Sequence, residues 1–169
     1  MDAHFKTIIW RQFGASIDML ERAIDACPGT LWGDRSKAPE FWYTAFHTLF
    51  YLDLYLSEST TGFAPPAPFT LDEMDERGIL PERVYTKEEL KRYLDHGRDK
   101  CRTTIATMSA ERANARCGME WLDMTMAELL LYNMRHVQHH AAQLNTLLRQ
   151  NIDSAPRWVR FTERTLFEE

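Results

Sequence analysis

The sequence predicts an all-α protein, a four-helix bundle of the up-and-down type with a long connection between its second and third helices. Four segments carry apolar residues at helical spacing, two of them open with a capping box, and no segment shows the sustained alternation of a strand. With 169 residues, 44% hydrophobic and 27% charged, the chain can build one full core. We therefore expect a single domain over residues 1–169, with the bundle at about 4–150 and a C-terminal tail at about 151–169.

The first two predicted helices cover residues 4–26 and 39–57. Pro28 and Gly29 end the first helix. The second is apolar on nearly all sides, which predicts the most buried helix of the bundle. Seven residues of the first helix form its expected apolar stripe, namely Phe5, Ile8, Ile9, Phe13, Ile17, Leu20 and Ile24.

Residues 58–85 form the long connection, because Pro, Gly, Ser, Thr and acidic residues mix there without a sustained period. Its length fits a crossing along the bundle better than a tight hairpin, and Phe63 and Phe69 are candidates to anchor it. The segment is also a candidate lid. Its acidic stretch, Asp72 to Glu76, is expected to be solvated loop surface.

The third and fourth helices are predicted from about residue 86 to 108 and from about 125 to 150. Thr86 and Glu89 form the first capping box, and Thr125 and Glu128 form the second. The tail carries apolar residues that are expected to pack back on the bundle or to mediate association, namely Pro156, Trp158, Val159, Phe161 and Leu166.

Histidines stand on apolar helix faces in two of these segments. At 100° per residue, His140 lies about 40° from His136 on the fourth helix, within the apolar stripe and one turn away. His47 lies on the second helix, flanked on its face by Tyr43 and Tyr51. Three imidazoles that converge in an interior are difficult to satisfy by hydrogen bonds alone, and a divalent metal ion is the ordinary solution.

Two further side chains on the fourth helix belong to this prediction. Gln143 lies between the two histidines in angle and one turn further on, where its amide could orient a ligand or hydrogen-bond a metal-bound water. His139 lies at the edge of the stripe, so it stays open as an alternative metal ligand to His140. Two ligands from one helix and one from another leave coordination positions free, as in catalytic metal sites.

The composition argues against several classes of partner and compartment. The net charge is −5 and no Lys or Arg cluster is present, so neither nucleic acid nor a membrane surface is expected as a partner. Three cysteines without metal-binding spacing indicate a reducing, cytoplasmic location. No secretory signal or membrane span is predicted.

Known metal motifs differ from this pattern. A zincin requires Glu directly after the first histidine of its motif, and Val137 occupies that position here. Di-iron bundles require Glu followed three residues later by His, a pair that this sequence lacks. Cysteine-based zinc sites require a thiolate spacing that is also absent.

The segments YTAFHTLFYLDLYL and RHVQHHAAQLNTLLRQ resemble the DinB-like superfamily of metal-binding four-helix bundles, also called DinB/YfiT-like. Its hallmarks are a histidine in the second helix and a pair four apart in the last, followed by a small residue, Gln and an aliphatic run. Ala142 stands where many relatives have Gly. The resemblance covers most of residues 1–150.

This resemblance implies a divalent metal ion, zinc, nickel or iron, held by His47, His136 and His140, and often a homodimer. Characterised relatives include thiol-dependent transferases and an isomerase that use low-molecular-weight thiols such as bacillithiol or mycothiol. We therefore expect a metal-dependent enzyme acting on a small-molecule substrate, a thiol-dependent transferase or a hydrolase. The alternatives are a non-catalytic bundle that binds a metal or small ligand, and a structural protein whose histidines are satisfied in its core.

Overall fold

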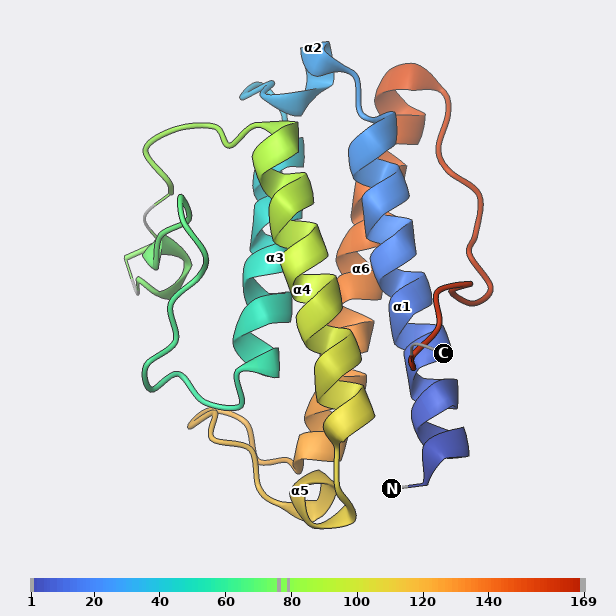
Figure 1. The fold of residues 1–169 in the computed structure, drawn as a ribbon. Helices are drawn as coiled ribbons and strands as arrows, with labels where there is room; N and C mark the ends of the chain where they lie inside the picture. Colours follow the sequence, from blue (N-terminus) through green and yellow to red (C-terminus); the bar gives the residue numbers. More distant parts are fainter. Residues whose placement is uncertain (1, 76, 79, 168–169) are drawn as a thin grey trace.

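The computed structural model describes residues 2–75, 77–78 and 80–167. Four long helices dominate it (Figure 1): α1 (Ala3–Ala26), α3 (Phe41–Leu56), α4 (Lys87–Thr107) and α6 (Met126–Ile152). Two short helices, α2 (Gly29–Trp32) and α5 (Ala110–Asn114), lie in the connections, and the 3₁₀ turn η1 (Asp72–Met74) lies in the longest of these. Within the described ranges there is no strand, only two isolated bridges, so the all-α prediction is confirmed.

The four long helices pack in a ring in which α1 and α3 each contact both α4 and α6. Side chains show that α3 and α4 run parallel. Near the start of α3, Phe46 contacts Tyr85, which lies just before α4, with ring centroids 4.9 Å apart. Further along both helices, Lys100 donates to the Ser57 hydroxyl at 2.6 Å. The strictly alternating up-and-down order is therefore wrong, because the long connection returns the chain to the end of the bundle from which α3 started (Figure 1).

Both capping boxes form as predicted. The Thr86 hydroxyl accepts from the Glu89 backbone N–H at 3.2 Å, and the Glu89 carboxylate accepts from the Thr86 N–H at 2.8 Å. Thr125 and Glu128 make the same reciprocal pair at 3.3 and 2.8 Å. Each box satisfies two helix-terminal N–H groups that would otherwise lack partners, which fixes where α4 and α6 begin.

The prediction that α3 is deeply buried is confirmed, since most of its side chains lie in the core. The apolar stripe predicted on α1 is wrong at two positions, because Phe5 and Ile8 are 49% and 45% exposed. On a helical wheel these residues point about 80° and 140° away from Phe13, whereas Ile9 lies within about 40° of it. The spacing along the chain therefore groups Phe5 and Ile8 with residues whose side chains leave the helix on a different side.

The long connection packs on the bundle through its aromatic residues. Phe69 is 8% exposed and stacks on Tyr93 with ring centroids 4.4 Å apart, and Phe63 meets Phe50 edge to face at 5.4 Å. The solvated surface expected for its acidic stretch is wrong at Glu73, whose side chain is only 3% exposed. Glu76 lies outside the described residues.

The tail returns along α1, and Val159 and Leu166 are buried while Trp158 and Phe161 remain largely exposed. Packing of the tail on the bundle is thus confirmed for its aliphatic residues. Among the helices that the structure describes, none combines the length and the apolar character needed to cross a bilayer.

Candidate metal centre

Three histidines converge between α3 and α6. These helices run antiparallel, and α3 contributes His47 while α6 contributes His136 and His140. The Nε2 atom of His136 lies 3.4 Å from Nε2 of His47 and 3.1 Å from Nε2 of His140. One ring nitrogen from each residue lies within 4.8 Å of the others. The structure therefore brings together the three predicted ligands.

The spacing of the three nitrogens suits a single small cation. Donors held tetrahedrally about 2.0–2.1 Å from a zinc ion lie about 3.3–3.4 Å from each other, close to the two distances observed here. Hydrogen bonds alone cannot satisfy this arrangement, because one proton on His136 Nε2 can point toward only one of the two neighbouring nitrogens. Imidazole is a donor that suits several divalent first-row metal ions.

The outer nitrogens of two of the rings have oxygen partners. His47 Nδ1 donates to Glu73 Oε2 at 2.7 Å, and His140 Nδ1 donates to Gln143 Oε1 at 2.7 Å. A carboxylate or amide oxygen can only accept, so both rings carry their proton on Nδ1 and turn the bare Nε2 lone pair inward. This is the usual arrangement of a histidine that binds a metal. His136 Nδ1 is buried without a partner in the described structure.

Burial holds His136 and His140 in their neutral form. Desolvation lowers the pKa of His136 to about 3, with the charges of His140 and His47 acting in the same direction. Desolvation also lowers the pKa of His140 to about 4, although the hydrogen bond that His140 donates to Gln143 opposes the change. Neutral imidazoles are the form that binds metal ions.

Glu73 is the residue of the site that the sequence did not reveal. It lies on η1 in the long connection, 26 positions from its partner His47. The Tyr51 hydroxyl donates to the Glu73 backbone carbonyl at 3.4 Å, and Glu73 Oε1 is buried without a partner among the residues described. No periodic pattern marks such a residue, and the only signal was a carboxylate on a connection long enough to fold back over the helices.

Tyr43 and Tyr51 flank His47 as predicted, with ring centroids 6.4 and 4.8 Å from the imidazole. Burial, followed by the neighbouring Glu73, raises the pKa of both hydroxyls. Both tyrosines therefore stay protonated and form an uncharged wall of the site, with the Tyr51 hydroxyl also fixing the connection that carries Glu73.

His139, the alternative ligand, is exposed and lies outside the cluster. It accepts a hydrogen bond from Gln143 Nε2 at 3.1 Å, so it steadies the amide whose oxygen engages His140. Among the described His, Cys, Asp and Glu side chains no fourth member joins the group. A metal ion held there would keep coordination positions for other ligands.

The fold and this cluster together define a class, a helical bundle with a three-histidine group between two antiparallel helices. The sequence profile of the DinB superfamily matches residues 12–144, and the chain belongs to that superfamily. The matched range contains all three histidines as well as Glu73 and Gln143. No curated protein and no solved structure matches the chain.

The depressed pKa values of His136 and His140 predict how the stability of the metal-free protein depends on pH. The unfolded chain takes up protons on these residues near pH 6.5, whereas the folded chain takes them up only near pH 4 and 3. The folded state binds fewer protons in between, so its stability is full above about pH 6.5 and falls as the pH drops.

Urea unfolding of chelator-treated protein between pH 7 and 5 measures this effect. The double variant His136→Gln, His140→Gln should show a weaker loss of stability over that interval than the unmodified chain. Equal losses in the two proteins would mean that burial does not hold His136 and His140 neutral.

Proposed function

We propose that this protein is a metal-dependent enzyme in which His47, His136 and His140 hold one divalent metal ion. The observation that carries the proposal is the convergence of three Nε2 atoms, two of which turn a lone pair inward because Nδ1 of His47 and of His140 donates to Glu73 and Gln143. Lone pairs that face each other in a partly buried site repel, and a cation bound between them would remove that repulsion.

A divalent ion in this position would supply Lewis acidity, which lowers the pKa of a thiol or of water and so provides a nucleophile at neutral pH. The protein's own residues orient and enclose the site. Glu73 fixes the ring of His47, Gln143 fixes the ring of His140, and the Tyr43 and Tyr51 hydroxyls stay neutral beside them. Three neutral ligands would leave such an ion strongly electrophilic, and the Glu73 carboxylate would compensate part of its charge.

The reaction class that fits is transfer of a low-molecular-weight thiol to a small electrophile, or hydrolysis of a small substrate. The sequence position of a zincin's general base is filled by Val137, which is fully buried in the core, so peptide hydrolysis by that mechanism is not available. Cys27, Cys101 and Cys117 are free and buried. Free thiols suit a reducing cytoplasm, where a thiol cosubstrate would also stay reduced.

Metal content tests the ligand assignment. Protein made without an affinity tag should contain about one equivalent of zinc, nickel or iron by elemental analysis. Replacing His47, His136 or His140 singly by Ala should remove most of it, because two imidazoles bind far more weakly than three. The matched control is His139→Ala, the adjacent histidine outside the cluster, which should keep its metal.

Turnover then separates an enzyme from a binding module. Metal-loaded protein supplied with a low-molecular-weight thiol and a chlorodinitrobenzene electrophile should form conjugate faster than the His140→Ala variant does. Stoichiometric metal without turnover of thiol or ester substrates would identify a non-catalytic metal-binding bundle. Full metal content in His140→Ala would refute the proposed site.

Glu73 provides a sharper test of how the site is organised. The variant Glu73→Gln keeps the shape of the side chain but weakens its hold on His47 Nδ1, and loss of such a partner typically lowers metal affinity about 10–100-fold. Competition with a chromogenic chelator measures the affinity directly. Asp72→Asn is the matched control, since it removes the same charge from the neighbouring position of η1, where the Asp72 carboxylate accepts a hydrogen bond from the Thr70 hydroxyl.

If Asp72→Asn weakens metal binding as much as Glu73→Gln does, the effect is one of general charge and the specific contact with His47 has no role. If neither variant changes the affinity, Glu73 does not orient a metal ligand.

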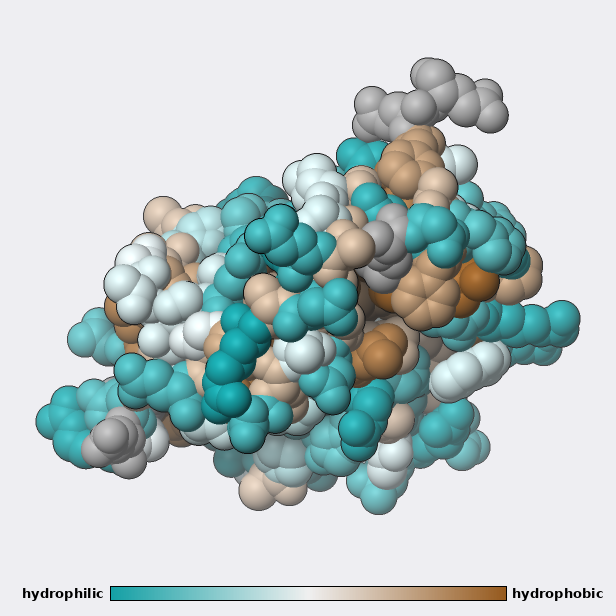
Figure 2. Space-filling model, turned by 90° about the horizontal axis from the view of Figure 1, so that it is seen from below, coloured by the Kyte–Doolittle hydropathy of each residue, from teal (hydrophilic) through white to brown (hydrophobic). Residues whose placement is uncertain are grey.

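A homodimer is part of the proposal, supported by apolar side chains exposed at the end of the bundle where α1 begins. Phe5 and Ile8 are exposed in the first turns of α1, and Figure 2 shows hydrophobic residues among hydrophilic ones on this lower end. Analytical ultracentrifugation should detect a dimer at micromolar concentration, and Phe5→Ser with Ile8→Ser should dissociate it. Leu80→Ser, an equally exposed position on the long connection, should not; a monomeric unmodified protein would refute the dimer.

A further inference from the structure

A second feature lies beside the candidate metal centre, a pocket of about 670 Å³ between α1, α6 and the C-terminal tail. Gln12 lines it from α1, Trp158 lines it from the tail, and Arg135, His136 and Gln138 line it from α6. Its volume is in the range of pockets that take a small organic molecule. Because His136 is also one of the three converging histidines, the pocket shares one wall residue with the candidate metal centre, although His47 and His140 are not among its lining residues.

The tail wall of the pocket is held in place by specific contacts. The Thr162 backbone N–H donates to the Arg11 carbonyl at 2.9 Å, and Trp10 Nε1 donates to the Arg164 carbonyl at 2.7 Å. Gly14 permits this approach, since a Cβ at that position would lie 2.9 Å from Thr162 Cβ and closer still to its methyl group. The tail therefore packs against the backbone of α1 itself.

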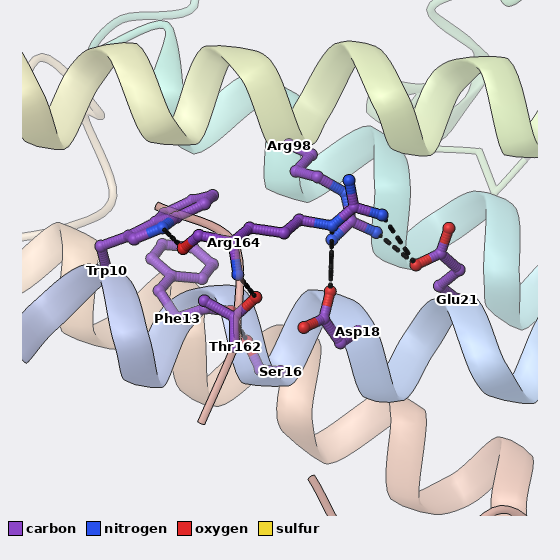
Figure 3. Close-up of polar contacts among 8 residues, drawn as sticks. All are labelled: Trp10, Phe13, Ser16, Asp18, Glu21, Arg98, Thr162 and Arg164. Atoms are coloured by element: carbon purple, nitrogen blue, oxygen red, sulfur yellow. Dashed lines mark hydrogen bonds and ion pairs between the residues drawn. The ribbon is translucent and has the colours of Figure 1, made fainter. Parts of the chain in front are cut away.

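Ion pairs strengthen the same attachment (Figure 3). The Arg98 guanidinium of α4 is buried and contacts both Asp18 and Glu21 of α1, and the Arg164 guanidinium approaches the same two carboxylates at 3.8 Å. Two cations facing two anions neutralise each other locally. Anchored from residue 159 to residue 164, the tail presents the exposed indole of Trp158 as a fixed wall rather than a loose end.

The electrostatics of the pocket differ from those of the whole chain. The protein carries a net charge of −5, yet none of the Asp and Glu residues that the structure describes lines the pocket. Arg135 lines the pocket, and its side chain makes no ion pair or hydrogen bond within the part of the chain that the structure describes. The same holds for the side-chain amide of Gln138, one turn away on α6. The guanidinium of Arg135 thus carries a permanent positive charge, and its N–H donors lack partners among the described residues. Beside it lie the amides of Gln12 and Gln138 and the indole of Trp158. Such a surface is complementary to an anion with an apolar body.

We infer that this pocket binds a small carboxylate-bearing molecule, with its carboxylate on Arg135 and Gln138 and its apolar body against Trp158. The guanidinium matches a carboxylate in a planar, two-pronged contact. The inference rests on the proposed function in one respect, because the pocket becomes a substrate site only if His136 helps to hold a metal ion. Binding of the carboxylate itself depends on the pocket residues alone.

Naphthoate and its uncharged analogue naphthamide are the probes, and isothermal titration calorimetry measures their dissociation constants. The unmodified protein should bind naphthoate more tightly than naphthamide. Arg135→Gln should weaken naphthoate about tenfold while leaving naphthamide unchanged, in line with the loss of one hydrogen-bonded charge. Arg149→Gln, on the same helix and outside the pocket, should change neither. Trp158→Ala should weaken both probes.

The titrations are repeated on chelator-treated protein to separate the pocket from the metal centre. Retained binding of naphthoate that still depends on Arg135 supports the inference, even if elemental analysis finds no metal and so refutes the proposed function. Binding that disappears with the metal and ignores Arg135→Gln means that the anion binds the metal ion, and overturns the inference. Equal affinity for naphthoate and naphthamide, or no binding of either, also overturns it.

Discussion

Three imidazoles share one interior point because α3 and α6 cross the bundle in opposite directions with a fixed register. One buried contact helps to set that register, since Asn133 Nδ2 donates to the Leu52 carbonyl at 3.0 Å less than one turn from His136. A shift of either helix by a single residue would rotate its side chains by about 100° and separate His47 from its partners. The polar contact thus protects a geometry that apolar packing alone would tolerate in several registers.

The sequence predicted the parts of this protein that depend on local periodicity and chemistry. The two capping boxes, the burial of α3 and the shared face of His136 and His140 all follow from angles and hydrogen bonds within a few residues. The prediction for Phe5 and Ile8 is wrong because it rests on their spacing along the chain and not on the angle at which their side chains leave the helix. Ile9, Phe13 and Ile17 are four residues apart, so their side chains leave the helix within about 40° of the next one, and the wheel angle alone predicts that they share a face.

Other features depend on tertiary structure, which local patterns do not encode. The parallel course of α3 and α4 is decided by where the long connection takes the chain, and a polar segment of that length is compatible with either direction. The polar neighbours of Glu73 in the sequence predict a solvated side chain. Its burial instead results from tertiary contacts of Phe69 and Tyr51, which hold the long connection against the helices. Arg135 likewise lies on an exposed face of α6, and it lines a pocket only because the C-terminal tail folds back beside it.

The contact between Glu73 and His47 joins the long connection, which is a loop, to the core helix α3. Loops open at low free energy, whereas core helices open only when the whole domain unfolds. A metal ion on His47 would favour the ring orientation that Glu73 enforces, and by thermodynamic reciprocity it would hold the connection closed by the same amount. Metal binding would then slow amide hydrogen exchange in the long connection, although that segment provides none of the three histidine ligands.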